Sequence, residues 1–599
     1  MKTQRMSAKR SLMPMLLVVL TTLFCSWAYA GGPLIVVNGR AVRWSRAEVR
    51  GGPLNSQTVD PSGRVMYRVD SGPLGTLNNQ HATALVDRIF KLYTDIPTAD
   101  IDFVNAGPIL DPATGNPVDV DGTNAGRYIS QKNPTFQNPI IFDNDGSISG
   151  NGGVLGFFGF LQEDDPLAPT ELREGFVVLN GAPLKKGTLS TTSFLGVFTH
   201  EFGHFAGPLD HAQINGNIAE NGDGSILPQG FSKAQAFDLY APFTETLFPF
   251  LFDAPDGSVL GDQFEDSGYF AASLDFDTQN ALSNLYPTAD YLSSRGTIEG
   301  RVIFKLDETE IPVSGINVVA RRIDQGAYPP PTNTVAFPSA PSLDSDGVPE
   351  SPPAQPATDS LATVASAVTG LDFGVGTYRI QGLPPGQYLV EIQQINPKAI
   401  KASGIGPVSN QFELPIKEEF FNGSGNSSNS ASVFLPVTVT AGQVTSGMDF
   451  VINGVSTDVP ALVSEKEPNE KTKKAQRLNI PVAVSASAAD SDDFLLRMTL
   501  PDGSIDPIED LYRITVDQKR IVFIVLEPTS GSGDLDMYLF TSFVNKKRTS
   551  LDDLNLLTFS AGPTANEFMS FQLEPGDYFI GVSAFSGNLN YRLRVVTTQ

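Results

Sequence analysis

Three of the protein's four histidines lie in one stretch of twelve residues, from His200 to His211. His200 and His204 are four residues apart, so on a helix they lie one turn apart on the same face, where two imidazoles can bind one metal ion. Glu201 follows His200 directly, and its carboxylate can reach a water on the metal rather than the metal itself. This pattern predicts zinc-dependent hydrolysis, with Glu201 as the general base toward the zinc-activated water.

A third zinc ligand is expected beyond the helix, because hydrolytic zinc sites use three protein ligands and one open position. Gly207-Pro208 turns the chain back, and both Asp210 and His211 follow within reach. The stretch resembles the zinc-binding signature of the metzincin metalloproteases, His-Glu-x-x-His-x-x-Gly-x-x-(His or Asp). Counted strictly, the third position is Asp210. With Pro208 as an insertion, the ending Leu209-Asp210-His211 is similar to the Leu-x-His ending of bacterial members, which implies His211 as the ligand and Asp210 as the alternative.

Metzincins place a methionine beneath the metal, but this chain has none between positions 66 and 448. The segment 245–249 is similar to that turn with Leu247 in the methionine's place, and leucine preserves an apolar floor. The rival assignment is a gluzincin, whose third ligand is a glutamate on a later helix. Glu220 and Glu245 are the candidates for that ligand.

The segments around the histidines predict an α+β catalytic domain. Residues 193–199 are apolar enough for a buried helix that leads into the metal site, and residues 78–93 have apolar side chains at helical spacing. The latter helix and the run 96–103, expected as the entry to a strand, resemble the opening of a matrixin catalytic domain, and 274–287 resembles the closing helix of bacterial matrixin-like domains. We therefore expect a metzincin-like catalytic domain over residues 31–295.

From residue 296 the pattern changes to short alternating strands. The turn Pro384-Pro385-Gly386 between two strands resembles the carboxypeptidase regulatory-like (transthyretin-like) fold, an all-β sandwich that we expect over residues 296–453. A Pro/Ser/Asp-rich stretch near 324–360 interrupts it and predicts a disordered insert. A linker is expected at 454–464.

The segment Glu465-Lys466-Glu467-Pro468-Asn469-Glu470 opens a last domain, expected over residues 465–599. This opening and the later strand motifs resemble the bacterial pre-peptidase C-terminal domain, an all-β sandwich attached to secreted proteases. Relatives of that domain hold Ca²⁺ through acidic residues of the entry segment, which implies Glu465, Glu467, Asn469 and Glu470 as ligands. A solvated acidic linker has the same composition, so both interpretations stay open.

A second candidate calcium site is the turn Asp143-Asn144-Asp145-Gly146, which follows an apolar strand. The carboxylates of Asp143 and Asp145 around a glycine turn suit Ca²⁺. Asp and Asn also favour turns without any metal, so the sequence leaves both roles open here as well.

Residues 1–30 have the pattern of a secretory signal peptide, with four early cations, an apolar run from 12 to 27, and the small-x-small site Ala28-Tyr29-Ala30. We therefore expect a secreted protein. The single cysteine, Cys25, lies in this leader, so no disulfide is expected in the mature chain.

The formal net charge of −25 disfavours nucleic acid and anionic membranes as partners. No segment after the leader reaches the length needed for membrane insertion. The resemblances together imply a secreted zinc metalloendopeptidase that acts on a protein or peptide substrate, with a catalytic domain followed by two β-sandwiches. The alternative is a secreted binding or adhesion protein with a vestigial or structural zinc site, and a hydrolase of non-peptide amides would need the same residues.

Overall fold

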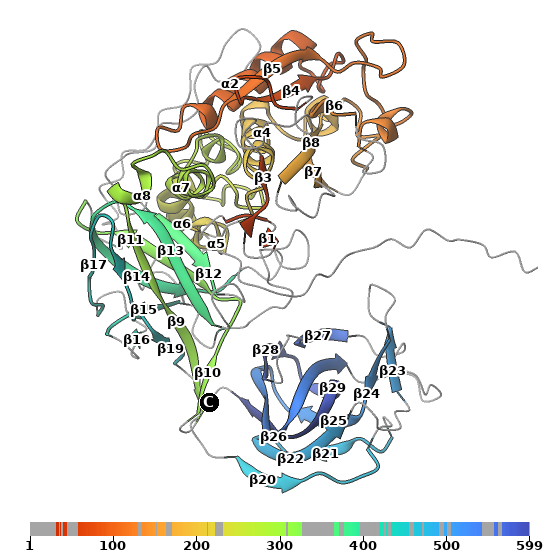
Figure 1. The fold of residues 1–599 in the computed structure, drawn as a ribbon, viewed down its shortest axis with the longest axis vertical. Coiled ribbons are helices and arrows are strands. Elements are labelled where there is room, and N and C mark those ends of the chain that lie inside the picture. The colour runs from red at the N-terminus through yellow and green to blue at the C-terminus, as the bar shows by residue number, and fades with distance from the viewer. Residues whose placement is uncertain are drawn as a thin grey trace, which may run out of the picture.

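The computed structural model shows a chain of successive regions, an N-terminal α/β region and two β-sheet regions (Figure 1). The described residues are 32–34, 36–37, 40–44, 58–129, 135–150, 153–162, 171–211, 214–221, 232–306, 309–325, 364–369, 376–395, 414, 418–423, 427–428, 433–453, 460–469, 473–489, 496–499, 505–541, 556–560 and 566–597. The expected signal peptide, Glu470 and nearly all of the expected insert at 324–360 lie outside them. Among the described residues, no helix is long and apolar enough to cross a membrane.

The N-terminal region is built on a six-stranded sheet whose strands are parallel except for one. Its strands, in spatial order, are β3 (Arg43–Trp44), β8 (Glu171–Asn180), β6 (Pro139–Asp143), β4 (Val65–Val69) and β5 (Phe103–Pro108), with β7 (Gly156–Gln162) antiparallel to β8. The sequence predicted an α+β domain, whereas the sheet has the mainly parallel arrangement of an α/β region. The reason is the connection from β4 to β5, which crosses over through a helix, as neighbouring parallel strands require.

Two long helices, α2 (Asn79–Thr94) and α4 (Thr191–Ala206), share the core of this region. Asn78 and Ser190 cap their N-termini by accepting bonds from backbone N–H groups one turn on. Phe90 of α2 stacks on Phe202 of α4 with 4.3 Å between ring centroids. The remaining helical elements are α3 (Ala182–Lys186), α5 (Gly216–Asn221), α6 (Lys233–Tyr240), α7 (Phe276–Leu285), α8 (Tyr291–Ser294) and the 3₁₀ turns Ala125–Arg127, Ala241–Phe243 and Phe270–Ala272.

The helices predicted at 78–93, at the metal motif and within 274–287 are therefore confirmed as α2, α4 and α7. A two-stranded ribbon, β1 (Val36–Val37) and β2 (Arg40–Ala41), precedes the sheet.

The second region contains two sheets whose facing side chains form one core, as in a sandwich. Strand β13 alternates buried and half-buried residues, as a strand with one face in a core does. One sheet contains β9 (Gly296–Leu306), β10 (Thr309–Pro312), β13 (Thr377–Leu383), β18 (Val444–Thr445) and β19 (Phe450–Val451). The other contains β11 (Asn317–Arg322), β12 (Val364–Val368), β14 (Gly386–Gln393), β15 (Glu418–Phe421), β16 (Ser427–Ser428) and β17 (Val437–Val439).

The third region is an antiparallel-rich sheet dominated by two 22-residue strands, β26 and β29, which pair along most of their length. Its strands are β20 (Ala461–Ser464), β21 (Gln476–Leu478), β22 (Val482–Ala489), β25 (Asp510–Val516), β26 (Arg520–Thr541), β27 (Leu556–Ser560), β28 (Glu567–Leu573) and β29 (Gly576–Thr597), with the separate pair β23 (Leu496–Thr499) and β24 (Ile505–Ile508). Strand β20 pairs with β22 and lies inside the stretch expected to be a linker, because Ala461–Ser464 completes the edge of this sheet.

The three regions contact one another in chain order. Asn280 of α7 donates its side-chain N–H to the Gln381 carbonyl of β13 at 2.8 Å. Phe304 of β9 lies 5.1 Å, between ring centroids, from both Phe523 and Phe568 of the third region. The second region therefore contacts both of its neighbours.

Candidate metal centre

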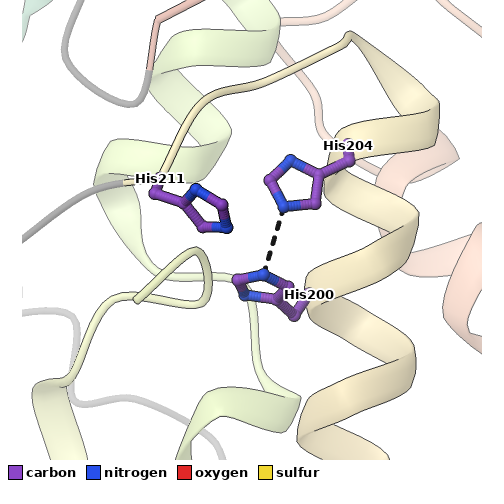
Figure 2. A group of neighbouring side chains, drawn as sticks. All are labelled: His200, His204 and His211. Atoms are coloured by element: carbon purple, nitrogen blue, oxygen red, sulfur yellow. Dashed lines mark hydrogen bonds between the residues drawn. The ribbon is translucent and has the colours of Figure 1, made fainter. Parts of the chain in front are cut away.

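Helix α4 presents His200 and His204 on one face at its C-terminal end (Figure 2). The Nδ1 of His200 lies 3.0 Å from the Thr246 carbonyl oxygen, and the Nδ1 of His204 lies 2.5 Å from the Leu209 carbonyl oxygen. These carbonyls fix both rings with their Nε2 atoms pointing toward the same space, as the second shell of a metal site does.

The third histidine comes from the loop that follows the helix. One ring nitrogen from each of His200, His204 and His211 lies within 4.8 Å of the other two, and all three rings surround one point in Figure 2. Asp210 is buried beside them, but its Oδ1 accepts a bond from the His211 backbone N–H at 2.8 Å, and it belongs to none of the potential metal-binding groups of the described residues. The loop therefore brings His211, rather than Asp210, toward the two helical imidazoles.

The N-terminal segment Gly32–Leu34 supports this loop from outside. The backbone N–H of Leu34 donates to the Pro208 carbonyl at 2.5 Å, and the N–H of Asp210 donates to the Gly32 carbonyl at 2.6 Å. Pro33 and Leu209 form the bridge between them. The residue before His211 is thus fixed by pairing to a segment far away in the sequence.

The hydrogen bonds of His200 and His204 indicate which ring nitrogens carry protons, and therefore whether a cation fits between the two rings. A carbonyl oxygen only accepts, so each Nδ1 carries a proton and each neutral ring has a lone pair on Nε2. The two Nε2 atoms lie 3.1 Å apart, and two lone pairs cannot bond to each other. Burial lowers the pKa of His204 to about 4, and burial with the neighbouring histidines lowers the pKa of His200, which disfavours an imidazolium. A metal ion satisfies both lone pairs, so the three histidines could hold a metal.

Glu201 is buried on the same helix, with 6% of its surface exposed. Burial raises the pKa of its carboxyl to about 8, so a proton is held readily there near neutral pH. Its side chain lies against Gly156 at the start of β7. A Cβ on that glycine would lie 2.7 Å from Glu201 Cγ and 2.9 Å from Oε1. Glycine is therefore the residue that leaves room for this carboxylate.

The turn at Thr246-Leu247 lies beneath the helix, where the sequence placed the apolar floor. Leu247 is fully buried, and its Cδ2 would lie 2.7 Å from a Cβ on Gly203, between the two helical histidines in sequence. Thr246 is held by Asp275, whose Oδ2 accepts from the Thr246 N–H at 2.8 Å. The carbonyl of Thr246 in turn contacts His200 Nδ1, so this turn also orients the His200 ring.

The two glutamates of the gluzincin assignment do not join the histidines, since neither Glu220 nor Glu245 is in a potential metal-binding group of the described residues. Glu245 is buried, and its Oε2 accepts a bond from the Ile214 N–H at 3.4 Å. Burial and the nearby Asp277 and Asp275 raise the pKa of Glu245, so it holds a proton there.

The acidic residues of the third region come together around Asp510 of β25. Carboxylate oxygens of Glu465, Glu467 and Asp510 lie within 4.8 Å of one another. Asn469 donates its side-chain N–H to Glu465 Oε1 at 2.8 Å. Sequence reasoning missed Asp510, because it lies far along the chain in a strand, and only the pairing of β25 with β21, the strand after the entry segment, brings it there.

The other expected acidic residues form turn contacts. Asp143 Oδ2 accepts from the backbone N–H of Ser149 at 2.7 Å, and Asp145 Oδ1 accepts from that of Ser147 at 3.0 Å. Neither belongs to a potential metal-binding group of the described residues. A further group, Asp534, Asp536 and Glu567, lies in the third region and was not foreseen.

No protein-family model and no curated protein matches the sequence. Among solved structures, 22% of the chain is similar to 99% of the pre-peptidase C-terminal domain of a collagenase from Bacillus anthracis, at 17% identity and a TM-score of 0.16. A 23% share is similar to all of PliG, a periplasmic inhibitor of g-type lysozyme from Aeromonas hydrophila, at 9% identity and a TM-score of 0.14. A 51% share is similar to 58% of the major pilin SpaD from Corynebacterium diphtheriae, at 10% identity and a TM-score of 0.12. TM-scores this low do not define a common fold, so the chemistry of this chain rests on its own side chains.

Proposed function

We propose that this protein is a secreted zinc metalloendopeptidase of the metzincin type. The observation that carries the proposal is the pair of Nε2 lone pairs of His200 and His204, 3.1 Å apart, with His211 beside them and a buried Glu201 on the same helix. A structural zinc site has no use for a base next to its ligands, whereas a hydrolytic site needs one.

A bound zinc ion would polarise the scissile carbonyl and acidify the attacking water. His200, His204 and His211 would hold that ion. Glu201 would accept the proton of the attacking water on its carboxylate and then donate it to the leaving amine, a role open to a buried carboxylate on the same helix as two of the histidines.

A peptide substrate is favoured by strand β7, which lies beside Glu201. Among the described strands, β7 pairs only with β8, so its other edge can pair with an extended peptide. Gly156, the residue in contact with Glu201, opens this strand. A substrate chain added at this edge would therefore pass close to the general base.

The first test replaces His211 or Asp210 with alanine and measures bound zinc alongside cleavage of denatured casein. We expect one zinc per wild-type chain and, for His211→Ala, zinc binding at least about 100-fold weaker, because a ligand outweighs the second-shell partners that cost about 10–100-fold. Asp210→Ala should bind zinc with an affinity closer to that of the wild type, since the Asp210 carboxylate bonds to the loop backbone.

The opposite pattern, with zinc lost in Asp210→Ala and kept in His211→Ala, would reassign the third ligand. A folded wild-type protein that neither binds zinc nor cleaves casein would contradict the hydrolase. The second candidate function, a secreted binding or adhesion protein that acts through its β-sheet regions, would then be favoured.

We also propose that Ca²⁺ binds the third region at Glu465, Glu467 and Asp510, in line with the resemblance to a pre-peptidase C-terminal domain. Three carboxylates within 4.8 Å of one another repel without a counter-ion. Asp510 is 2% exposed, and its Oδ2 accepts a bond from the Tyr591 hydroxyl at 2.6 Å. Burial and the charge of Glu465 raise the pKa of Asp510, so a proton substitutes for the cation in the absence of calcium.

This raised pKa sets the sign of a pH effect. The folded state binds the proton on Asp510 more tightly than the unfolded chain does, so protonation of Asp510 stabilises the fold when calcium is absent. This contribution is fully present below about pH 4, the pKa of the residue in the unfolded chain. It is lost as the pH rises through the higher pKa of the folded state. We expect the melting temperature of this region in chelator to fall with rising pH, and the increase on adding Ca²⁺ to be larger at pH 8 than at pH 5. Asp510→Asn should abolish most of that increase. A calcium effect of equal size in Asp510→Asn would contradict the site.

A further inference from the structure

Arg321 of strand β11 is a fully buried arginine in the second region, and its side chain contacts the N-terminal region. Its Nε donates to Glu391 Oε1 of the neighbouring strand β14 at 2.6 Å, with both side chains fully buried. Its Nη1 donates to Asn215 Oδ1 at 2.8 Å. Burial of an arginine charge costs free energy unless the charge is paired, so the Arg321 guanidinium is held to the two oxygens that it contacts.

Asn215 lies four residues after His211, just before helix α5. Its backbone is left-handed (φ +60°), and its Nδ2 donates to the Phe243 carbonyl at 2.8 Å. The preceding Ile214 packs in a buried cluster with Val319 of β11 and Val364 of β12. The chain beyond the third histidine is therefore held by side chains of the second region.

A second line of contacts leads to His200. The Ser366 N–H of β12 donates to Asp277 Oδ1 at 3.0 Å, and Asp277 lies near enough to Glu245 for its charge to add to burial in raising the pKa of Glu245. Glu245 is adjacent to Thr246, whose carbonyl oxygen lies 3.0 Å from His200 Nδ1. The sheet that contains β11 and β12 thus contacts the chain just after the third histidine and, through Asp277, lies near the residue that precedes Thr246.

We propose that the second region is a structural part of the metal centre and that Arg321 is a positioning residue for His211, acting through Asn215. This inference rests on the proposed zinc function and deepens it. Without the Arg321–Asn215 bond, the loop has more conformations to lose when zinc binds, and zinc affinity falls.

The test uses the full-length protein in two variants that break the same bond differently. Arg321→Met combined with Glu391→Gln removes both buried charges together, and the amide oxygen keeps an acceptor for Gln393 Nε2, which lies 2.8 Å from Glu391 Oε1. Asn215→Gly removes this acceptor together with the Nδ2 bond to the Phe243 carbonyl, and glycine suits φ +60°. Arg322→Met is the matched control, since the neighbouring Arg322 bonds to Asp324 at the surface.

Two quantities are measured, the zinc dissociation constant by competition with a chelator and the hydrogen exchange of backbone amides 207–216. We expect both bond-breaking variants to bind zinc about 10-fold more weakly, as a lost supporting contact does, and to exchange faster in this segment. Arg322→Met should match the wild type in both. If the double variant does not fold, Asn215→Gly decides alone.

Wild-type zinc affinity in the bond-breaking variants would overturn the inference, even with faster exchange. Hydrogen exchange of the backbone amides 207–216 at the wild-type rate in these variants would overturn the inference as well. If the wild type itself binds no zinc, the proposed function fails separately. The exchange of 207–216 in the metal-free variants then decides whether the second region braces this loop.

Discussion

Glu201→Gln is expected to lower kcat for a denatured protein substrate by about 10²–10⁴-fold, the usual contribution of a general base, while zinc binding stays near the wild-type value. The amide has the shape of the carboxylate but cannot accept the proton of the attacking water. The glutamine also carries no charge, so its burial at this position, which is 6% exposed, adds no desolvation cost to the free energy of folding. The metal stays because three imidazoles, not this carboxylate, converge on one point.

The measurement is kcat alongside bound zinc, with Glu174→Gln as the matched control. Glu174 is a buried carboxylate of β8 that accepts bonds from Thr135 Oγ1 at 2.7 Å and from the Gln137 N–H at 3.0 Å. A glutamine keeps that acceptor, so activity should change by less than a few-fold. If Glu201→Gln lost zinc together with activity, Glu201 would be a ligand rather than a base.

The local part of this site was predictable from the sequence because it depends on short spacings. Two histidines four apart, with an apolar run before them, specify a helix with both imidazoles on one face. The apolar floor at Leu247 was also foreseen, since packing beneath a helix needs only an apolar residue of the right size.

The parts that depend on tertiary contacts could not be predicted. Spacing alone left both Asp210 and His211, and only the resemblance to bacterial metzincins favoured His211; the loop turn that places it is fixed by pairing with Gly32–Leu34. The parallel sheet follows from a crossover connection, which residue composition alone does not show. Arg321 looks like any charged strand residue in the sequence, and arginines are almost never fully buried, so its contact with Asn215 gives no sequence signal.

Gly156→Ala should reduce kcat about 100-fold, because displacement of a catalytic group by about 1 Å has effects of that order. The new methyl group would lie 2.7 Å from Glu201 Cγ and 2.9 Å from its Oε1, so the carboxylate must move. Zinc binding should persist, since none of the three histidines is touched. Val154→Ala is the control, because Val154 lies two residues earlier with 40% of its surface exposed.

The double variant Gly156→Ala with Glu201→Gln separates this cause from a general disturbance of strand β7. If the alanine acts only by displacing the base, displacement of an amide that no longer acts as a base costs no further activity, and the double variant should be as active as Glu201→Gln alone. A further large loss in the double variant would mean that Gly156 acts on the substrate edge of β7 instead. Full activity in Gly156→Ala would mean that the carboxylate works from a position away from this strand.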